Sequence, residues 1–200
     1  MHTILSLLIL LLLFMAPDAN APSIVPTQGY STSTLIHFEH AGNRQIRLHG
    51  VWTMAPDIVI CDGITTEFRV RQAVRFWERL GYTFGSISSD SDPFNCRRNE
   101  IGKIKIMLPD SNTKMENNLA ITNTERLVAT NENIRATIII HSFATTKPLV
   151  LEHEIGHALG WQHSTMYGHL MNPEVERLGH DTLGIRHRDY LRLGNEIITR

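Results

Sequence analysis

The first clear pattern of apolar and polar positions predicts a buried strand followed by an amphipathic helix. Residues 57–61, Asp-Ile-Val-Ile-Cys, form a short apolar run that ends at an Asp-Gly pair, which is typical of a buried strand before a turn. Apolar side chains then recur at the spacing of a helix over residues 70–80. We expect Thr65 or Thr66 to cap this helix at its start and Gly81 to end it.

Two later segments alternate as strands do. In residues 104–108 isoleucine and leucine alternate with Lys105 and Met107, which predicts a half-buried strand. Residues 134–140 repeat the alternation, while Ile139 indicates burial on both faces. The polar residues between them predict a loop and an edge strand near Leu119 to Thr122. The order strand, helix, strands, helix is an α/β arrangement.

The N-terminus has the pattern of a targeting segment. An apolar run over residues 4–14 is too short to span a bilayer and fits the core of a signal peptide. Ala19 and Ala21 are the small residues that a signal peptidase reads, so we expect cleavage after Ala21 and a secreted, extracellular or periplasmic protein. The alternative is an uncleaved anchor. Residues 22–56 are then an N-terminal arm or a short pro-segment, and residues 57–200 the catalytic domain.

Composition narrows the classes of function. The chain has 200 residues, 42% of them hydrophobic, which is enough to bury a core. Its formal charge of −1 gives no excess of cations, so we expect neither nucleic-acid binding nor electrostatic binding to a membrane. The unusual count is 11 histidines, and histidine is the commonest metal ligand among side chains.

The chain contains two cysteines, Cys61 and Cys96. In an exported protein an even pair favours a disulfide, and the absence of a Cys-x-x-Cys spacing argues against a thiolate metal site. The alternative is two buried free thiols.

The candidate chemistry lies on a predicted helix that begins near Pro148, with Thr145 or Thr146 as its cap. His153 and His157 are four residues apart and fall about 40° from each other on a helical wheel, so both imidazoles can meet one zinc ion. Leu151, Ile155, Ala158 and Leu159 gather on the opposite face, where they can pack on the sheet. Glu154 stands beside the first histidine and can reach a water on the metal.

The helix must then stop so that a third ligand can approach from another direction. Gly160 permits a tight or left-handed turn, and His163 completes the sequence His-Glu-x-x-His-x-x-Gly-x-x-His. Three neutral imidazoles leave one zinc position open for water, which is the arrangement of a catalytic site. Eight residues later, Met171 lies in a segment that can form a tight turn beneath the three histidines.

The other histidines lack ligand spacing, and we interpret most of them as surface or loop residues. This group is His37, His40, His49, His141, His169, His180 and His187. By sequence, His141 and His169 are the two that are placed to lie near the cleft and contact substrate.

These motifs resemble those of the metzincin zinc endopeptidases, and most of all the matrixins. The resemblance rests on the spacing from His163 to Met171, on Ser164 directly after the third histidine, and on the Leu-Met-x-Pro turn. It implies the zincin fold: a twisted, mostly parallel five-stranded sheet with one antiparallel edge strand, a backing helix and an active-site helix. It also implies a small subdomain below the cleft from residue 164 onward, with a final helix near Asp181 to Ile198.

The sequence departs from the matrixin pattern in several places. A Pro-Arg-Cys-Gly cysteine switch is missing, and so are the Gly-Asp and Phe-Asp-Gly segments that hold the structural zinc and calcium of the family. We therefore assign one catalytic zinc ion and no other metal. Asn172 replaces the usual tyrosine after the methionine, and Val175 stands where the wall of the substrate pocket would end.

The expected function is zinc-dependent hydrolysis of peptide bonds in proteins or peptides, by a monomer. Zinc-bound water attacks the carbonyl, and Glu154 is the general base. Side chains of the substrate would enter a pocket near Ser164, Pro173 and Val175. Two alternatives remain: a secreted module that binds zinc without catalysis, and a metal-dependent hydrolase of a non-peptide amide.

Overall fold

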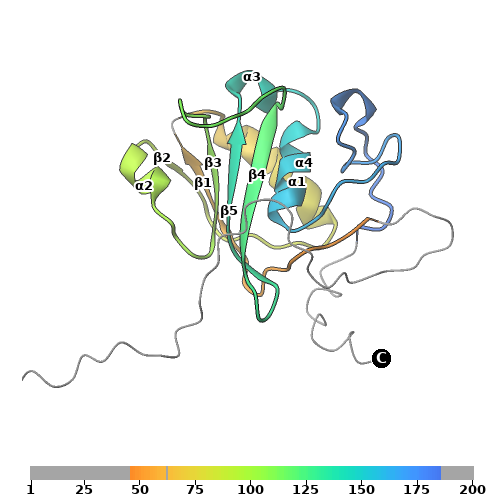
Figure 1. Ribbon diagram of the computed structural model, residues 1–200, viewed down its shortest axis with the longest axis horizontal. Coiled ribbons are helices and arrows are strands. Elements are labelled where there is room, and N and C mark those ends of the chain that lie inside the picture. Colours follow the sequence, from red (N-terminus) through yellow and green to blue (C-terminus); the bar gives the residue numbers. More distant parts are fainter. Residues whose placement is uncertain (1–45, 62, 186–200) are drawn as a thin grey trace, which may run out of the picture.

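The computed structural model describes residues 46–61 and 63–185, which form a five-stranded sheet with helices on both faces (Figure 1). The strand order is β2-β1-β3-β5-β4. The strands are β1 (Asp57–Cys61), β2 (Ile87–Asp90), β3 (Lys103–Met107), β4 (Ala120–Leu127) and β5 (Glu132–Ile140). Neighbouring strands are parallel except β4 and β5, which are antiparallel. The expected α/β fold, a mostly parallel sheet with one antiparallel edge strand, is confirmed.

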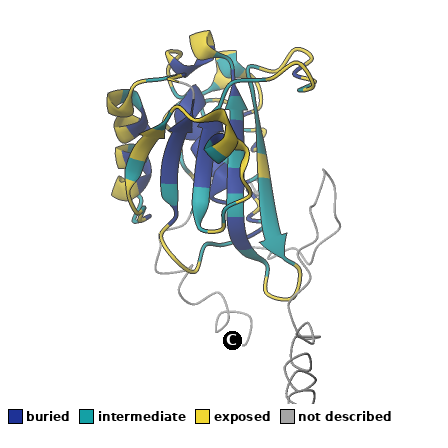
Figure 2. Cartoon of the chain, turned by 90° about the vertical axis from the view of Figure 1, so that its left-hand side faces the viewer, coloured by how far each residue is buried: buried dark blue, intermediate teal, exposed yellow. Residues whose placement is uncertain are grey.

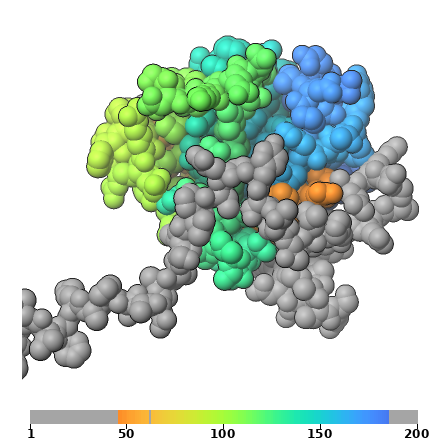
Figure 3. All heavy atoms as spheres, in the orientation of Figure 1, coloured from red at the N-terminus to blue at the C-terminus, as the bar shows by residue number. Residues whose placement is uncertain are grey.

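Two helices cover one face of the sheet and a short one lies against the other. Helices α1 (Glu67–Arg79) and α4 (Val150–Ala158) lie side by side (Figure 1). Helix α2 (Pro93–Arg97) contacts β1 and β2. The short α3 (Ser142–Thr145) precedes α4, and a 3-10 turn, η1 (Val175–Arg177), lies in the last described part. Figure 3 shows residues beyond about 165 (blue) at the end of the molecule opposite α2 (yellow-green).

Helix α1 forms as its sequence predicts. The Thr66 hydroxyl accepts a hydrogen bond from the backbone N–H of Arg69 at 3.2 Å, which is a side-chain N-cap. The apolar stripe of the helix is buried and ends with Trp77, while Gly81 adopts a φ of 89° just after the helix. This stripe packs against the isoleucines of β1 and β3 in the main core.

The alternation of β3 and β5 places their side chains on the two faces of the sheet, with two departures from the prediction. Ile104 and Ile106 are fully buried against the helices, as expected. Lys105, expected on the exposed side of a half-buried strand, is only 5% exposed, because α2 and the loop after it cover that face. Ile139 of β5, expected to be buried as well, is only half-buried. The edge strand β4 is also half-buried over most of its length (Figure 2).

The start of α4 differs from the prediction. The helix begins at Val150, and its N-cap residue, Leu149, has a φ of 64° and provides no side-chain cap. Thr145 and Thr146 do not cap it, because their hydroxyls donate to the carbonyls of Ser142 and Phe143 within the preceding turn. Helix propensity alone does not predict that both threonine hydroxyls bond to carbonyls of the preceding short helix, α3.

A segment before β1 packs against the end of α4. Leu48 pairs with Trp161 in an antiparallel bridge, and the backbone N–H of His49 donates to the carbonyl of Gly160 at 2.9 Å. The indole of Trp52 donates to the carbonyl of Ala158 at 2.8 Å. Part of the stretch that the sequence places before the catalytic domain, residues 46–56, therefore contributes directly to the packing around α4.

Several sequence-based expectations fall outside the described residues. These are the signal peptide over residues 1–21, the role of residues 22–45, and most of the final helix expected from Asp181 to Ile198. The described start of that helix, residues 181–185, is not helical; Asp181 instead pairs with His169 in an isolated bridge.

A disulfide joins Cys61 at the end of β1 to Cys96 in α2, with a Cα–Cα distance of 5.9 Å. Val59 and Cys61 point to the face of the sheet opposite the helices α1 and α4, and they form a small apolar cluster with Cys96 and Met107. The alternative of two free thiols is not what the structure has. The disulfide holds α2 on the outer face of the sheet.

Replacing both cysteines by alanine should lower the free energy of unfolding by roughly 3–4 kcal/mol, because the unfolded chain loses a closed loop of about 35 residues. The midpoints of denaturant unfolding for wild type and the double variant measure this difference. Equal midpoints, or alkylation of both cysteines in denatured but non-reduced wild type, would contradict the disulfide.

Candidate metal centre

Helix α4 is buried on nearly every side, so its position is tightly determined. Leu151, Ile155 and Ala158 are fully buried in the main core. The indole N–H of Trp77 in α1 donates to the carbonyl of Glu152 at 2.8 Å. The guanidinium of Arg69 binds both carboxylate oxygens of Glu152, at 2.8 and 2.6 Å. Two contacts from α1 therefore fix the helix turn that carries the first histidine.

The three histidines of the motif meet at one point. Nε2 of His157 lies 3.0 Å from Nε2 of His153 and 3.1 Å from Nε2 of His163. The three side chains form a group able to hold a metal ion, the one such group found among the described residues. His153 is buried, His157 is half-buried and His163 is exposed, so the centre opens to solvent on the side of His163.

Hydrogen bonds at the far nitrogens set the tautomers of two of the rings. Nδ1 of His153 lies 2.8 Å from the carbonyl oxygen of Leu170, and Nδ1 of His157 lies 2.7 Å from that of Trp161. A carbonyl only accepts, so each Nδ1 carries the proton and each Nε2 presents a lone pair to the centre. Burial lowers the pKa of His153 to about 4 and that of His157 well below 6.5, which keeps both rings neutral.

This donor set fits a zinc ion. Lone pairs that face one another at this distance repel unless a cation lies between them. Nitrogens about 2.0–2.1 Å from a tetrahedral zinc ion lie roughly 3.3 Å apart, close to the separations between these Nε2 atoms. Three imidazoles with an open side are the ligand set of a catalytic zinc site.

Gly160 turns the chain so that His163 can approach from outside the helix. Its φ is 107°, a left-handed conformation that favours glycine, and a Cβ there would lie 2.2 Å from the carbonyl oxygen of Gly50. Just after the turn, the backbone N–H of Gln162 donates to the carbonyl of Arg47 at 2.9 Å. The segment before β1 therefore braces the turn that brings in the third histidine.

Met171 lies in a turn against α4. The side chain is fully buried, and a Cβ on Gly156 would lie 2.5 Å from its sulfur. The lack of a Cβ at Gly156, the residue just before His157, therefore leaves the space in which the methionine side chain packs. The backbone N–H of Ser164 donates to the carbonyl of Met171 at 2.7 Å, which joins the turn to the residue after His163.

Glu154 lies beside the histidines and faces the edge strand. It is 7% exposed, and burial raises its pKa to about 7. The hydroxyl of Thr122 in β4 donates to Oε2 at 2.6 Å. A carboxyl group with a pKa near neutrality is suited to accept and return a proton.

The three residues predicted to line a substrate pocket differ in how far they are exposed to solvent. Ser164 is buried at 4% exposure, and its hydroxyl accepts a hydrogen bond from the N–H of Met166 at 3.4 Å. Pro173 is exposed and Val175 is half-buried. They lie along the segment that follows His163, but the pocket itself stays a prediction.

The other histidines among the described residues do not join the centre. His169 is fully buried and holds backbone groups, so a contact with substrate is excluded for it. His141 is half-buried and stacks on Phe143 with ring centroids 5.3 Å apart. His49 is half-buried, and His180 lies near the ring of Phe76. The other three, His37, His40 and His187, lie outside the described residues.

Sequence reasoning missed the residues that support the ligands. Thr122 was assigned to an edge strand without a role; Thr122 and Thr124 share one side of β4, and both contact α4. The pairing of Arg69 with Glu152 crosses 83 positions and leaves no local signal. His169 accepts from the N–H of Met171 at 2.9 Å and donates to the carbonyl of Leu183 at 3.1 Å.

The sequence profile of the Matrixin peptidase family matches residues 83–194, which is more than half of the chain. The chain belongs to the matrixin family. This membership confirms the resemblance to matrixins and identifies the protein as a zinc metallopeptidase in general terms. The match begins after α1, although β1 and α1 belong to the same sheet and core. The comparison with curated proteins gives no match.

Replacing His169 by alanine in this matrixin should weaken zinc binding about 10–100-fold, the usual range for groups behind the ligands. The reason is that the bond from Met171 N–H is lost next to Leu170, whose carbonyl orients His153. His169→Asn, which retains an acceptor for that N–H, should bind zinc more tightly than His169→Ala. Competition with a fluorescent chelator measures all the affinities.

The matched control is His180→Ala, since His180 is exposed and its ring lies near that of Phe76 in α1. It should bind zinc like wild type. Wild-type affinity in His169→Ala would contradict this role.

Proposed function

We propose that this matrixin is a secreted zinc-dependent endopeptidase in which His153, His157 and His163 hold the catalytic zinc ion and Glu154 is the general base. The observation that carries the proposal is the convergence of the three histidine side chains beside Glu154, a buried glutamate of α4. A zinc ion in this position supplies a Lewis acid that polarises a carbonyl and makes water acidic enough to react near neutral pH.

The role of Glu154 follows from its surroundings. The hydrogen bond from Thr122 fixes Oε2, which leaves Oε1 as the atom that accepts the proton of the attacking water. Burial alone raises the pKa of this carboxyl group, whereas a cation at the histidines favours its ionised form. The ionised carboxylate accepts the proton and then delivers it to the leaving amine of the cleaved peptide.

Strand β4 is the element that we propose binds the substrate. It is an edge strand, so one of its sides has backbone groups that no other strand of the sheet engages. It also contacts α4 through Thr122 and Thr124. An extended peptide added to this edge would place its carbonyl groups next to the histidines. Side chains after the cleaved bond would then lie near Ser164, Pro173 and Val175.

Secretion is supported by the N-terminal pattern and by the disulfide. Disulfides persist in oxidising compartments, so the bond between Cys61 and Cys96 agrees with an extracellular or periplasmic location. Among the described residues, none of the helices combines the length and the apolar composition needed to cross a bilayer. We propose a monomer that acts on proteins or peptides.

The variant Glu154→Gln tests the mechanism. Glutamine retains the size of the side chain but does not accept a proton at neutral pH, so kcat for peptide cleavage should fall by about 10²–10⁴-fold or more. Zinc content should stay near one ion per chain, because the three histidines are intact. Peptide turnover and zinc content are measured on the same samples, with and without a chelator.

Two further variants complete the test. His157→Ala removes a ligand and should lose zinc and activity together. Glu176→Gln makes the same chemical change at an exposed position in η1 and should behave like wild type. Turnover by Glu154→Gln within about tenfold of wild type would refute the general base. Zinc bound without cleavage of any peptide in a library would favour the non-catalytic module or the hydrolase of a non-peptide amide.

A further inference from the structure

The face of the sheet away from the metal centre carries a row of cations. Because side chains alternate along a strand, Ile104 and Ile106 of β3 point to the helices while Lys103 and Lys105 point the other way. On β5, Arg135 also points away from the helices and is the direct neighbour of Lys103 in the parallel pairing. Like charges in such a position destabilise a sheet unless something negative lies close to them.

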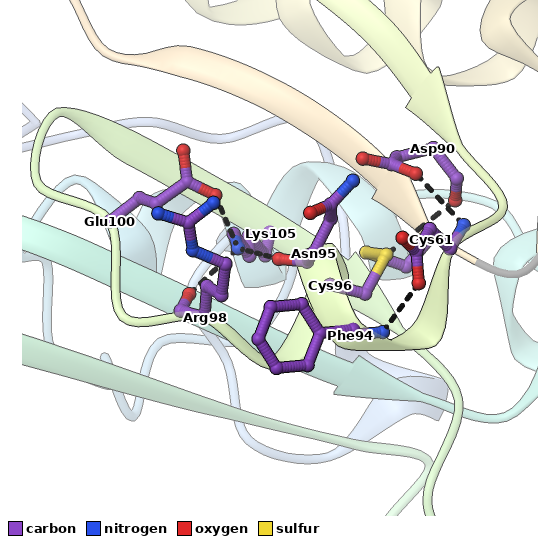
Figure 4. The surroundings of a disulfide bond; sticks show 9 residues. Cys61, Asp90, Phe94, Asn95, Cys96, Arg98, Glu100 and Lys105 are labelled. Carbon is purple, nitrogen blue, oxygen red and sulfur yellow. Dashed lines mark hydrogen bonds and ion pairs between the residues drawn. A yellow bond between two sulfur atoms is a disulfide. The ribbon is translucent and has the colours of Figure 1, made fainter.

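Residues 98–102, the short segment between α2 and β3, are held against the face of the sheet that carries these cations. The disulfide holds α2 on the sheet, and the ammonium group of Lys105 binds groups of both α2 and the segment (Figure 4). Its Nζ donates to the carbonyls of Asn95 at 2.6 Å and Arg98 at 2.7 Å, and to a carboxylate oxygen of Glu100 at 3.1 Å. All three N–H donors of Lys105 are used, so the position of the segment is fixed by the fold.

Between this segment and the strands lies a cavity of about 180 Å³. Its lining contains five cationic side chains and one carboxylate: Arg97, Arg98, Lys103, Lys105, Arg135 and Glu100. Glu100 is shared between the two lysines, whose hydrogen bonds lower its pKa to about 2 and keep it ionised. Glu125, which lies on β4, forms an ion pair with Arg135. The cations in and around the cavity still outnumber the carboxylates.

One donor in this lining lacks an acceptor. Nε of Arg135 is buried and has no hydrogen-bond partner, although its Nη2 binds Glu125. A guanidinium group stays charged at any physiological pH, and a buried N–H without an acceptor is costly. The side chain of Arg98 is exposed and forms no ion pair within the described part of the chain. Arg135 and Arg98 both line the cavity, so an unsatisfied guanidinium donor and a cation without an ion pair belong to the side chains at its border.

A second cavity, of about 580 Å³ beside α1, does not have this property. Its most buried cation, Arg69, is already paired with Glu152 through two hydrogen bonds.

We propose that the cavity between Arg98, Lys103 and Arg135 is a binding site for one small oxyanion group, a carboxylate or a sulfate, on the side of the sheet opposite the metal centre. Guanidinium groups bind both kinds of oxyanion through paired N–H donors, and the cavity has room for one such group. The site is independent of the proposed peptidase activity, since α1 and α4 pack on the other face of the sheet.

Nuclear magnetic resonance of the zinc-loaded full-length protein tests this site. Sodium sulfate and sodium acetate are titrated separately at constant ionic strength, with chloride as the balancing anion. The Nε–H signal of Arg135, assigned with Arg135→Gln, should shift and saturate, as should the backbone amides of Asn99 and Thr137, which line the same cavity. Tighter binding of sulfate indicates a tetrahedral ligand, and tighter binding of acetate indicates a carboxylate.

Arg98→Gln should weaken the binding at least about fivefold, since it removes one charge-assisted contact from an exposed position without disturbing the fold. Arg71→Gln, which removes the same charge from the exposed side of α1, should bind like wild type. Peptide cleavage should be unchanged in both variants. Shifts that rise without saturation, or equal affinities in wild type and Arg98→Gln, would overturn the proposal, whether or not the peptidase activity is found.

Discussion

Three neutral imidazoles, with Nε2 of His157 about 3 Å from Nε2 of each of the other two, require a cation, and the rest of the structure is arranged to hold them there. The carbonyls of Leu170 and Trp161 fix the proton on Nδ1 of His153 and His157. The lone pair of each of these rings is therefore on Nε2, which faces the centre. Each carbonyl belongs to a different segment: one to the turn at Met171, the other to the turn at Gly160. The metal centre therefore links the buried helix to both segments that follow it.

The position of α4 depends in turn on contacts from distant parts of the chain. Trp77 and Arg69 of α1 hold the turn at Glu152, and the segment before β1 supports Gly160 from the other end. Burial serves two purposes here, because it packs the helix and also shifts proton affinities. It keeps His153 neutral and ready to bind a metal, and it raises the pKa of Glu154 towards neutrality.

The local patterns of the sequence predicted most of the fold and the three candidate ligands. Spacing within one helix suffices for His153 and His157, and the glycine turn that brings in His163 has its own local signal. The start of α4, the burial of Lys105 and the role of His169 could not be predicted in this way. Each depends on a neighbour that is distant in sequence or on competition for the same hydroxyl or backbone group. The pairing of Cys61 with Cys96 was predictable because the sequence has two cysteines.

Three imidazole nitrogens should form the protein part of the first coordination shell of the metal. X-ray absorption at the zinc edge, on protein reconstituted with one equivalent of zinc, tests it most directly. We predict scattering from three imidazole nitrogens at about 2.0–2.1 Å and no sulfur ligand, because both cysteines are in a disulfide. A shell with fewer than three imidazoles, or with sulfur at about 2.3 Å, would contradict the convergence of His153, His157 and His163 on one metal ion.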